Sequence, residues 1–322
     1  MKRINNKNLI IILIVLVGIF VLVRIFRTPT QSSNLKKELV SVDTAKITQI
    51  KLTPKSGDGE IIFSRTLGNW TLKQANKQFN VEKGAATALL SQLVKLTPQK
   101  MVSRKKEKWT EYQVGDSATR VQALVGDDVV ADLMIGRIGF NQSPAQMQQQ
   151  QQLGGGGGFG GAFTYVRVAD EDEVYTVDGF LESTFNRSIN DFRNKTLIRL
   201  PSEDITKVSF NYPDSGFVVE KRNNKWWIGE SLADSTKMKS YLNSLNFKNA
   251  SSFADDFQAN IPNALSLVID GASGNLATIK AWKRENDWVF ESTQQAGVFF
   301  SSDGSGIFQT LLERKKNLVA NP

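Results

Sequence analysis

The most strongly apolar part of the chain lies close to its N-terminus. Leu9 to Val23 are apolar apart from Gly18, and Ile25 and Phe26 extend the run past one arginine. A helix over this stretch would be roughly 27 Å long, close to the ~30 Å hydrocarbon core of a bilayer. We therefore predict a transmembrane anchor over residues 1–27. The apolar residues that would hold it in the lipid include Leu9, Ile12, Leu16, Phe20 and Val23.

The residues that flank this run indicate whether it is cleaved and how it is oriented in the membrane. A cleaved signal peptide is the alternative, but Arg24 and Arg27 follow the run directly and no Ala-x-Ala-like cleavage site follows them. Basic residues before the run favour an N-terminus on the cytoplasmic side. We predict a single-pass protein of the cytoplasmic (inner) membrane, with residues 28–41 as a linker and the C-terminal body on the periplasmic side.

Beyond the linker, the pattern of apolar and polar positions occurs twice. Ile62–Trp70 and Val218–Trp226, 156 residues apart, both predict a strand, a turn with Gly or Asn, and a second strand that begins with Trp. A helix follows in each copy, and Asp234 is the expected N-cap of the second one. The apolar positions i, i+3, i+4 and i+7 are Ala86, Leu89, Leu90 and Leu93 in the first helix and Met238, Tyr241, Leu242 and Leu245 in the second.

The spacing between corresponding residues then falls along the chain. It is 144 for Leu124 and Val268, and about 124 for the final hairpins, Val174–Gly179 and Val298–Gly304. An insertion of about twenty residues in the first copy explains the drop, and the Gln- and Gly-rich residues 141–161 lie at the right place for it.

This duplication predicts the fold class. We expect an α+β protein in which the N-terminal transmembrane helix is followed by two tandem repeats. Each repeat is a largely antiparallel sheet with amphipathic helices. The repeats are predicted over residues 42–199, with the low-complexity loop 141–161, and over residues 200–322.

Composition excludes several classes of function. The chain has no Cys and no His, which rules out disulfides, thiolate nucleophiles, Ser-His-Asp triads and metal sites built from Cys or His. The formal net charge is +8, but five cations and no acid fall within residues 1–27, so the remainder carries only +3. A nucleic-acid binder needs a concentrated basic face on its folded part, so we expect no nucleic-acid partner.

Three motifs suggest chemistry, but each has a simpler structural interpretation. The Gly run contains G-x-G-x-x-G at Gly155 and Gly156, but without the strand and helix that a dinucleotide site needs. Asp170–Glu173 lacks calcium-site spacing and lies between two strands, which predicts a hairpin turn. Asp127–Asp128 and Asp255–Asp256 are interpreted in the same way. We therefore predict no catalytic residues, no bound cofactor and no metal site.

The densest basic cluster of the predicted body is a candidate contact surface. A solvated turn is its simplest interpretation; the functional hypothesis is a contact with an acidic partner or with anionic lipid headgroups. Its residues are Arg104, Lys105, Lys106, Lys108 and the adjacent Trp109. Trp70, Trp226 and Trp227 occupy corresponding strand positions, so we expect them to pack on the sheets rather than to form a glycan-binding platform.

Several stretches of the chain also resemble a bacterial family. They are Asn34–Thr48 (NLKKELVSVDTAKIT), Lys105–Val121, Thr164–Phe180, Phe185–Leu197 and the Lys-Trp-Trp turn at 225–227. With the N-terminal anchor, they resemble the domain-of-unknown-function 4340 family over nearly the whole chain. Members of that family are often encoded beside gliding-motility-type ABC transporter genes, a permease and a GldG-like auxiliary protein. The resemblance implies an accessory subunit of the cell envelope and brings no active site with it.

These observations lead to one expectation and two alternatives. We expect a non-enzymatic, membrane-anchored envelope protein, an accessory subunit of an ABC-type transporter. Its partners would be the lipid bilayer, the permease and the GldG-like auxiliary protein. The first alternative is a periplasmic module that binds a polymer or lipid between the two repeats. The second is a carboxylate-dependent hydrolase, which would need two acids about 5–10 Å apart in a groove.

Overall fold

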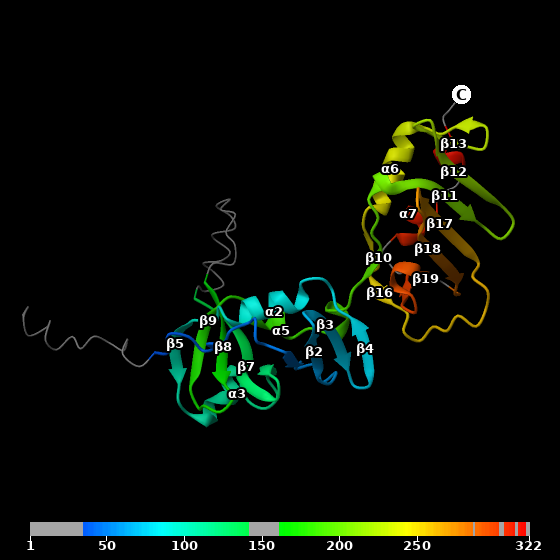
Figure 1. Ribbon diagram of the computed structural model, residues 1–322. Helices are drawn as coiled ribbons and strands as arrows, with labels where there is room; N and C mark the ends of the chain where they lie inside the picture. The colour runs from blue at the N-terminus through cyan, green and yellow to red at the C-terminus, as the bar shows by residue number, and fades with distance from the viewer. Residues whose placement is uncertain (1–34, 142–160, 286, 303–305, 313–314, 320–322) are drawn as a thin grey trace, which may run out of the picture. The chain divides into compact units, whose positions relative to one another are not determined.

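The computed structural model describes residues 35–141, 161–285, 287–302, 306–312 and 315–319 (Figure 1). These residues form two compact units. The first comprises the described residues up to 78 and residues 84–187; the second comprises residues 79–83 and the described residues from 188 onward. The predicted anchor lies outside the described residues. Within the described part, no helix is both long and apolar enough to cross a membrane.

The first unit is built on a nine-stranded sheet with the strand order β4-β3-β2-β1-β6-β7-β8-β9-β5. From β3 to β5, neighbouring strands are antiparallel. The strands are β1 (Gln49–Thr53), β2 (Ile61–Thr66), β3 (Asn69–Gln74), β4 (Lys77–Asn80), β5 (Pro98–Ser103), β6 (Thr119–Val125), β7 (Asp128–Phe140), β8 (Ala162–Val168) and β9 (Val174–Asp178).

The second unit repeats this sheet strand for strand, in the order β14-β13-β12-β11-β17-β18-β19-β20-β16. Its strands are β11 (Ile205–Asn211), β12 (Gly216–Arg222), β13 (Lys225–Ile228), β14 (Ser231–Leu232), β16 (Ser252–Phe253), β17 (Leu265–Gly271), β18 (Gly274–Lys283), β19 (Trp288–Ser292) and β20 (Phe299–Ser301). A small sheet of β10 (Thr196–Ile198) and β15 (Lys248–Asn249) accompanies it. The predicted architecture of two largely antiparallel repeats is confirmed.

Short helices accompany the sheets. In the first unit they are α2 (Ala85–Leu93), η1 (Lys106–Lys108), α3 (Trp109–Tyr112) and α5 (Leu181–Phe185). In the second they are η2 (Ile189–Asp191), η3 (Ser202–Asp204), α6 (Ser235–Leu245), η4 (Thr293–Gln295), α7 (Ile307–Leu311) and α8 (Lys315–Leu318). The apolar faces predicted for α2 and α6 are the faces that the structure buries.

Alternation within the strands explains where the cores form. In β1, Ile50 and Leu52 are fully buried, and the residues between them are more exposed. In β11, Val208 and Phe210 are buried in the same way. Because side chains of a strand point alternately to the two faces, this spacing turns one face of each sheet toward the helices.

The predicted insertion lies between two strands, as the spacing indicated. β7 ends at Phe140 and β8 begins at Ala162, whereas the corresponding β18 and β19 are joined across residues 284–287. Residues 142–160, which include the Gly run, lie outside the described residues. The sequence boundary between repeats at 199/200 stays a prediction; the structural division falls at 187/188 and transfers residues 79–83 to the second unit.

Candidate functional site

The candidate site lies along β5, which pairs only with β9 and forms one edge of the first sheet. Pro98 begins the strand, where its missing N–H costs least. The pairing with β9 shifts register between Pro98 and Lys100 and again between Met101 and Ser103. Such irregularities bend an edge strand away from the sheet. The outer main-chain edge of β5 is therefore not covered by another strand of the described chain.

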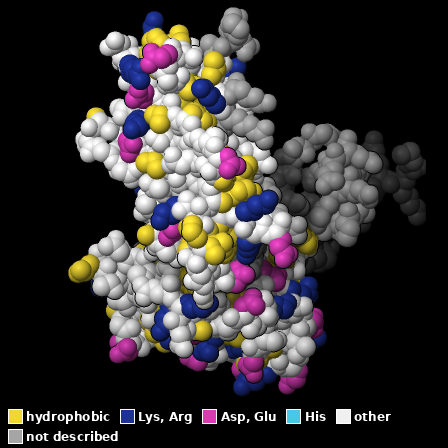
Figure 2. All heavy atoms as spheres, turned by 90° about the vertical axis from the view of Figure 1, so that its right-hand side faces the viewer, with side chains coloured by type: hydrophobic (Ala, Val, Ile, Leu, Met, Phe, Trp, Pro, Cys, Tyr) yellow, Lys and Arg dark blue, Asp and Glu magenta, His cyan; other side chains and the backbone are white. Residues whose placement is uncertain are grey.

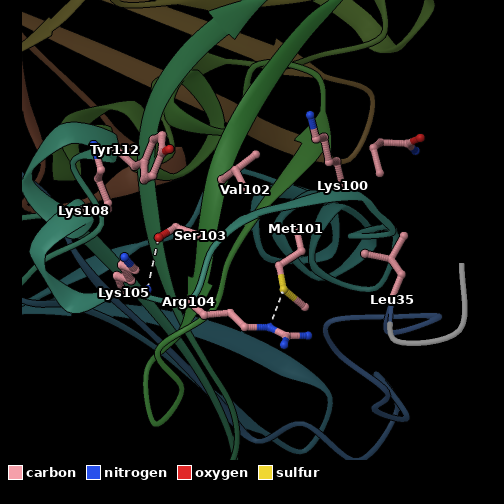
Figure 3. A pocket seen from close by; sticks show the side chains of 10 residues that line it. Leu35, Lys100, Met101, Val102, Ser103, Arg104, Lys105, Lys108 and Tyr112 are labelled. Carbon is pink, nitrogen blue, oxygen red and sulfur yellow. Dashed lines mark hydrogen bonds between the residues drawn. The ribbon is translucent and has the colours of Figure 1, made fainter. Parts of the chain in front are cut away.

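A groove with a volume of about 660 Å³ follows this edge (Figure 3). Figure 3 shows Lys100 and Val102 on one side of β5 and Met101 on the other. Consecutive residues of a strand can line one hollow only if the hollow runs along the strand's edge. The lining residues are Leu35, Gln99, Lys100, Met101, Val102, Ser103, Arg104, Lys105, Lys108 and Tyr112.

The charged residues of this lining are all cationic: Lys100, Arg104, Lys105 and Lys108. Among the described residues, no carboxylate lies within ion-pair distance of Lys100 or Lys105. Arg104 lies 4.0 Å from a Glu173 oxygen, and its Nε is 3.1 Å from the Met101 sulfur. The groove is therefore an anion-attracting surface with apolar groups beside its charges.

Lys108 is the one lining cation with a close acidic partner. Its Nζ donates to Glu111 Oε2 at 2.7 Å. This hydrogen bond, with the charge of Glu111, raises the pKa of Lys108 above its usual value. The carboxylate of Glu111 partly offsets the charge of Lys108, which leaves Lys100 and Lys105 as the stronger attractors of an external anion.

The segment η1–α3, which supplies Lys108 and Tyr112, is held by a buried arginine. Arg167 is 3 % exposed, and its Nε donates to the Val114 carbonyl at 3.0 Å and its Nη1 to the Ala169 carbonyl at 2.6 Å. The guanidinium lies 3.7 Å from the centre of the Trp109 ring. Burial lowers the pKa of Arg167 but leaves it charged, because an arginine begins far above neutrality.

The predicted contact cluster is therefore divided between two roles. Arg104, Lys105 and Lys108 line the groove. Trp109 stacks on Arg167 and donates from Nε1 to the Asp172 carbonyl at 3.2 Å. Lys106 lies over the Trp109 ring and 3.6 Å from Asp172. Whether this surface contacts a partner stays a prediction.

The sequence pattern missed several groove residues because their proximity depends on the fold. Leu35 precedes the first strand by fourteen positions, and Met101 and Ser103 belong to a strand without clear apolar alternation. Lys100 is separated from the predicted cluster by three uncharged residues. Tyr112 reaches the groove through α3. The one available signal was the density of cations from 100 to 108.

The acidic motifs lie in turns or ion pairs. Residues 170–173 join β8 to β9 as predicted, and Glu171 pairs with Lys36. Asp255 pairs with Arg193, and Asp256 lies 3.6 Å from Arg284. Within the described ranges, no group of three or more acidic side chains is placed to hold a metal ion.

The face shown in Figure 2 does not concentrate one kind of charge. On this face, Lys and Arg side chains (dark blue) are interspersed with Asp and Glu side chains (magenta). Trp70, Trp226 and Trp227 are half-buried on their sheets, and Trp226 packs against the core of the second unit. A shallow hollow of about 230 Å³ beside Trp226 also includes Lys221, Lys239 and Glu203, so its charges are mixed.

Fold and groove together define a duplicated β-rich scaffold with an open basic edge. The profile of the family described as "Domain of unknown function (DUF4340)" matches residues 70–266, more than half of the chain. The chain belongs to this family. The match includes four of the five stretches that carried the resemblance, all but residues 34–48. No curated protein and no solved structure matches the chain.

Proposed function

We propose that the protein is a membrane-anchored, non-enzymatic subunit of an envelope complex, and that it acts by binding a partner protein. The observation that carries this proposal is the groove along β5, which combines an open strand edge with four cations and no lining carboxylate. Edge strands and charged grooves are recurring docking surfaces for proteins. The ABC-type permease and the GldG-like auxiliary protein are the proposed partners.

The position of the groove along the chain supports this assignment. Leu35 lines the groove, and the proposed anchor ends at Arg27, eight residues earlier. Eight residues span at most roughly 29 Å when fully extended. A groove tethered this closely would meet the periplasmic segments of other membrane subunits, so the anchor and the groove favour the same class of partner.

Two measurements test the anchor. The full-length chain should stay in the membrane fraction after an alkaline carbonate wash, whereas Leu16→Lys with Phe20→Lys should release it, because each buried charge opposes insertion by roughly 3 kcal/mol. Protease added to spheroplasts should digest the body. A protected body, or a mature protein that lacks its first thirty residues, would contradict the proposal.

Crosslinking tests the partners. The tagged chain is crosslinked in intact cells, and the permease and the GldG-like protein are quantified against an unrelated single-pass protein tagged in the same way. Specific enrichment of either partner supports the proposal. Recovery of only soluble cytoplasmic proteins would contradict both the topology and the partner assignment.

A further inference from the structure

The second unit has its own last edge strand, β16, at the position that β5 holds in the first. In β16, Phe253 pairs with Phe300 of β20; in β5, Met101 pairs with Tyr175 of β9. Phe300 and Tyr175 hold the same place in the two sheets, because Phe300 pairs with Phe290 opposite Ala281 and Tyr175 pairs with Val166 opposite Ile135. Met101 therefore stands where the second unit has Phe253, 152 residues later, which is also the spacing of Leu93 in α2 and Leu245 in α6.

The chain also enters each unit past the same place. In the first unit the Leu39 N–H donates to the Leu96 carbonyl at 3.1 Å, and in the second the Ala250 N–H donates to the Lys195 carbonyl at 2.9 Å. The strands β1 and β11 correspond at a spacing of 158 residues, as for Ile50 and Val208. At this spacing Leu39 corresponds to Leu197 of β10, and the groove residue Leu35 corresponds to Arg193.

In the second unit, an extended segment is bound at this place. Residues 79–83 run antiparallel to the chain before Lys195. The Glu82 N–H donates to the Phe192 carbonyl, and the Asn194 N–H donates to the Asn80 carbonyl, each at 2.8 Å. These are the main-chain bonds of a short strand pair.

Arg193 links this bound segment to β16. It is 4 % exposed, and its guanidinium lies 4.2 Å from the centre of the Phe79 ring and 3.5 Å from that of Phe253. Two hydrogen bonds of 2.6 and 2.8 Å join it to Asp255, and a third of 2.9 Å joins it to Asn190. The space beside β16 is thus filled by an aromatic ring and an ion pair from the chain itself.

The first unit leaves the corresponding space open and reverses its charge. Among the described residues, positions 35–38 make no backbone hydrogen bond, and the groove runs beside them. At the spacing of Met101 and Phe253, the acids Asp255 and Asp256 of the second unit correspond to Ser103 and Arg104 of the first, and Lys105 follows directly. A segment that fills this groove must therefore bring carboxylates.

We propose that the groove binds an extended, acidic segment of a partner protein. The segment lies along the free edge of β5, with carboxylates toward Lys100, Arg104 and Lys105 and alternate apolar side chains against Leu35 and Met101. The main-chain groups of an edge strand supply affinity for such a segment, and the side chains on its two faces supply specificity. This inference rests on the proposed function and adds the chemistry of the partner.

An anionic bilayer is the competing partner for these cations. Lipid headgroups would use the charges alone. They would leave the main-chain edge of β5 and the apolar groups inside the hollow unused. The observed combination favours a peptide, and the two partners differ in a measurable way because only a peptide depends on its own backbone N–H groups.

The probe is a fluorescent, acetylated heptapeptide with alternating Glu and Val, titrated into the full-length chain in detergent micelles. We expect saturable anisotropy changes that weaken with added salt. Lys100→Glu with Lys105→Glu should weaken binding at least about tenfold, because two charge-assisted contacts become repulsive. The same peptide N-methylated at alternate residues keeps its charge but loses N–H donors, and should bind at least about fivefold more weakly.

A matched control reverses two exposed lysines near the opposite edge of the same sheet, Lys73→Glu with Lys77→Glu. This variant should bind the peptide as the wild type does. Four results would overturn the inference: no binding to the wild type, equal losses in both double variants, no effect of N-methylation, or displacement of the peptide by phosphatidylglycerol vesicles but not by unlabelled peptide. Circular dichroism and hydrogen exchange confirm that each variant is folded.

The two proposals fail in distinguishable ways. Suppose that the peptide does not bind the wild type, and that the permease crosslinks equally to the wild type and to the variant with Lys100→Glu and Lys105→Glu. The groove inference is then wrong, and the proposed function stands. If the peptide binds in the groove but neither envelope partner is recovered, the proposed function is wrong, and the groove serves another acidic protein.

Discussion

The two units share the order of all nine strands and differ most at the last edge strand. β5 has six residues and an open basic groove, whereas β16 has two residues and lies against Phe79, Arg193 and Asp255. The apolar spacing that builds the sheets was kept in both copies, because both cores need it. The last edge strand was free to diverge, since in the second unit residues of the chain itself fill the space beside it. The comparison teaches that an open surface can arise where a duplicated unit lacks an internal ligand.

The largest effect should come from removing the ion pair of the second unit. Arg193→Met keeps much of the apolar volume between the two rings but leaves Asp255 without its partner. Loss of one member of a buried pair costs about 3–5 kcal/mol; because the Asp255 side chain is 44 % exposed, we expect about 2–3 kcal/mol. Hydrogen exchange of amides in β16 and β20, followed by mass spectrometry, measures the loss.

The control is Lys37→Met, in the segment of the first unit that corresponds to the chain around Arg193. Lys37 is exposed, so this change should stay within about 0.5 kcal/mol. If both substitutions lowered stability equally, the edge of the second unit would not be more filled than that of the first, and the comparison would be wrong.

A somewhat smaller loss of stability is expected from a substitution at Gly136 in β7, next to the groove residue Tyr112. A Cβ there would lie 2.3 Å from the Tyr112 carbonyl oxygen and 2.6 Å from Val114 Cγ1. Because the first of these contacts is with backbone, Gly136→Ala should displace α3 and destabilise the first unit by about 2 kcal/mol. Exchange of the α3 amides should accelerate, while that of α6 stays unchanged. Unaltered exchange in α3 would show that Tyr112 is not held by this contact.

The third prediction concerns the starts of the corresponding helices α2 and α6. Asp234 Oδ1 accepts from the N–H groups of Thr236 and Lys237 at 2.9 and 3.0 Å, whereas Gly84, at φ 83°, gives α2 no side-chain cap. Asp234→Ala should therefore destabilise the second unit by about 1 kcal/mol. Ser235→Ala, one residue later and exposed, is the control and should change stability by only a few tenths of a kcal/mol. Denaturant midpoints, read by pulse proteolysis of fragments from each unit, compare the two.

The smallest effect should appear only at alkaline pH. Burial, followed by the charges of Glu171 and Glu173, raises the pKa of Tyr175 above its usual value near 10. The folded chain then keeps a proton that the unfolded chain releases, so this contribution to stability is complete below about pH 10 and is lost as the pH rises further. The second unit has Phe300 at this position. Tyr175→Phe should reduce the alkaline loss in the first unit; an unchanged denaturant midpoint between pH 9 and 11 would argue against it.

Local patterns predicted the elements that bury an apolar face. The i, i+3, i+4 and i+7 positions of α2 and α6, the cap at Asp234 and the place of the insertion between β7 and β8 were all predicted correctly. Each of these depends on residues close together in sequence or on a spacing conserved between the copies. Duplication helped further, because two weak patterns in register support each other.

The groove could not be predicted in the same way. β5, with the sequence PQKMVS, has no alternation that would indicate a strand, and its pairing with β9 joins residues more than seventy positions apart. Arg167 and Arg193 are buried only because distant carbonyls, rings and a carboxylate surround them. Trp109 beside four cations suggested an exposed contact, whereas its ring also covers Arg167. Buried charge is a property of the fold rather than of local sequence.

Residues 79–83 impose a practical limit on how the chain can be dissected. They follow β4 in the sequence but supply part of the second unit. A fragment that starts at residue 188 would lack Phe79 over Arg193 and the two backbone bonds from this segment. Such a fragment should fold poorly by itself and should recover when a synthetic peptide carrying these five residues is added in trans. Any attempt to express the second unit separately therefore has to include residues 79–83.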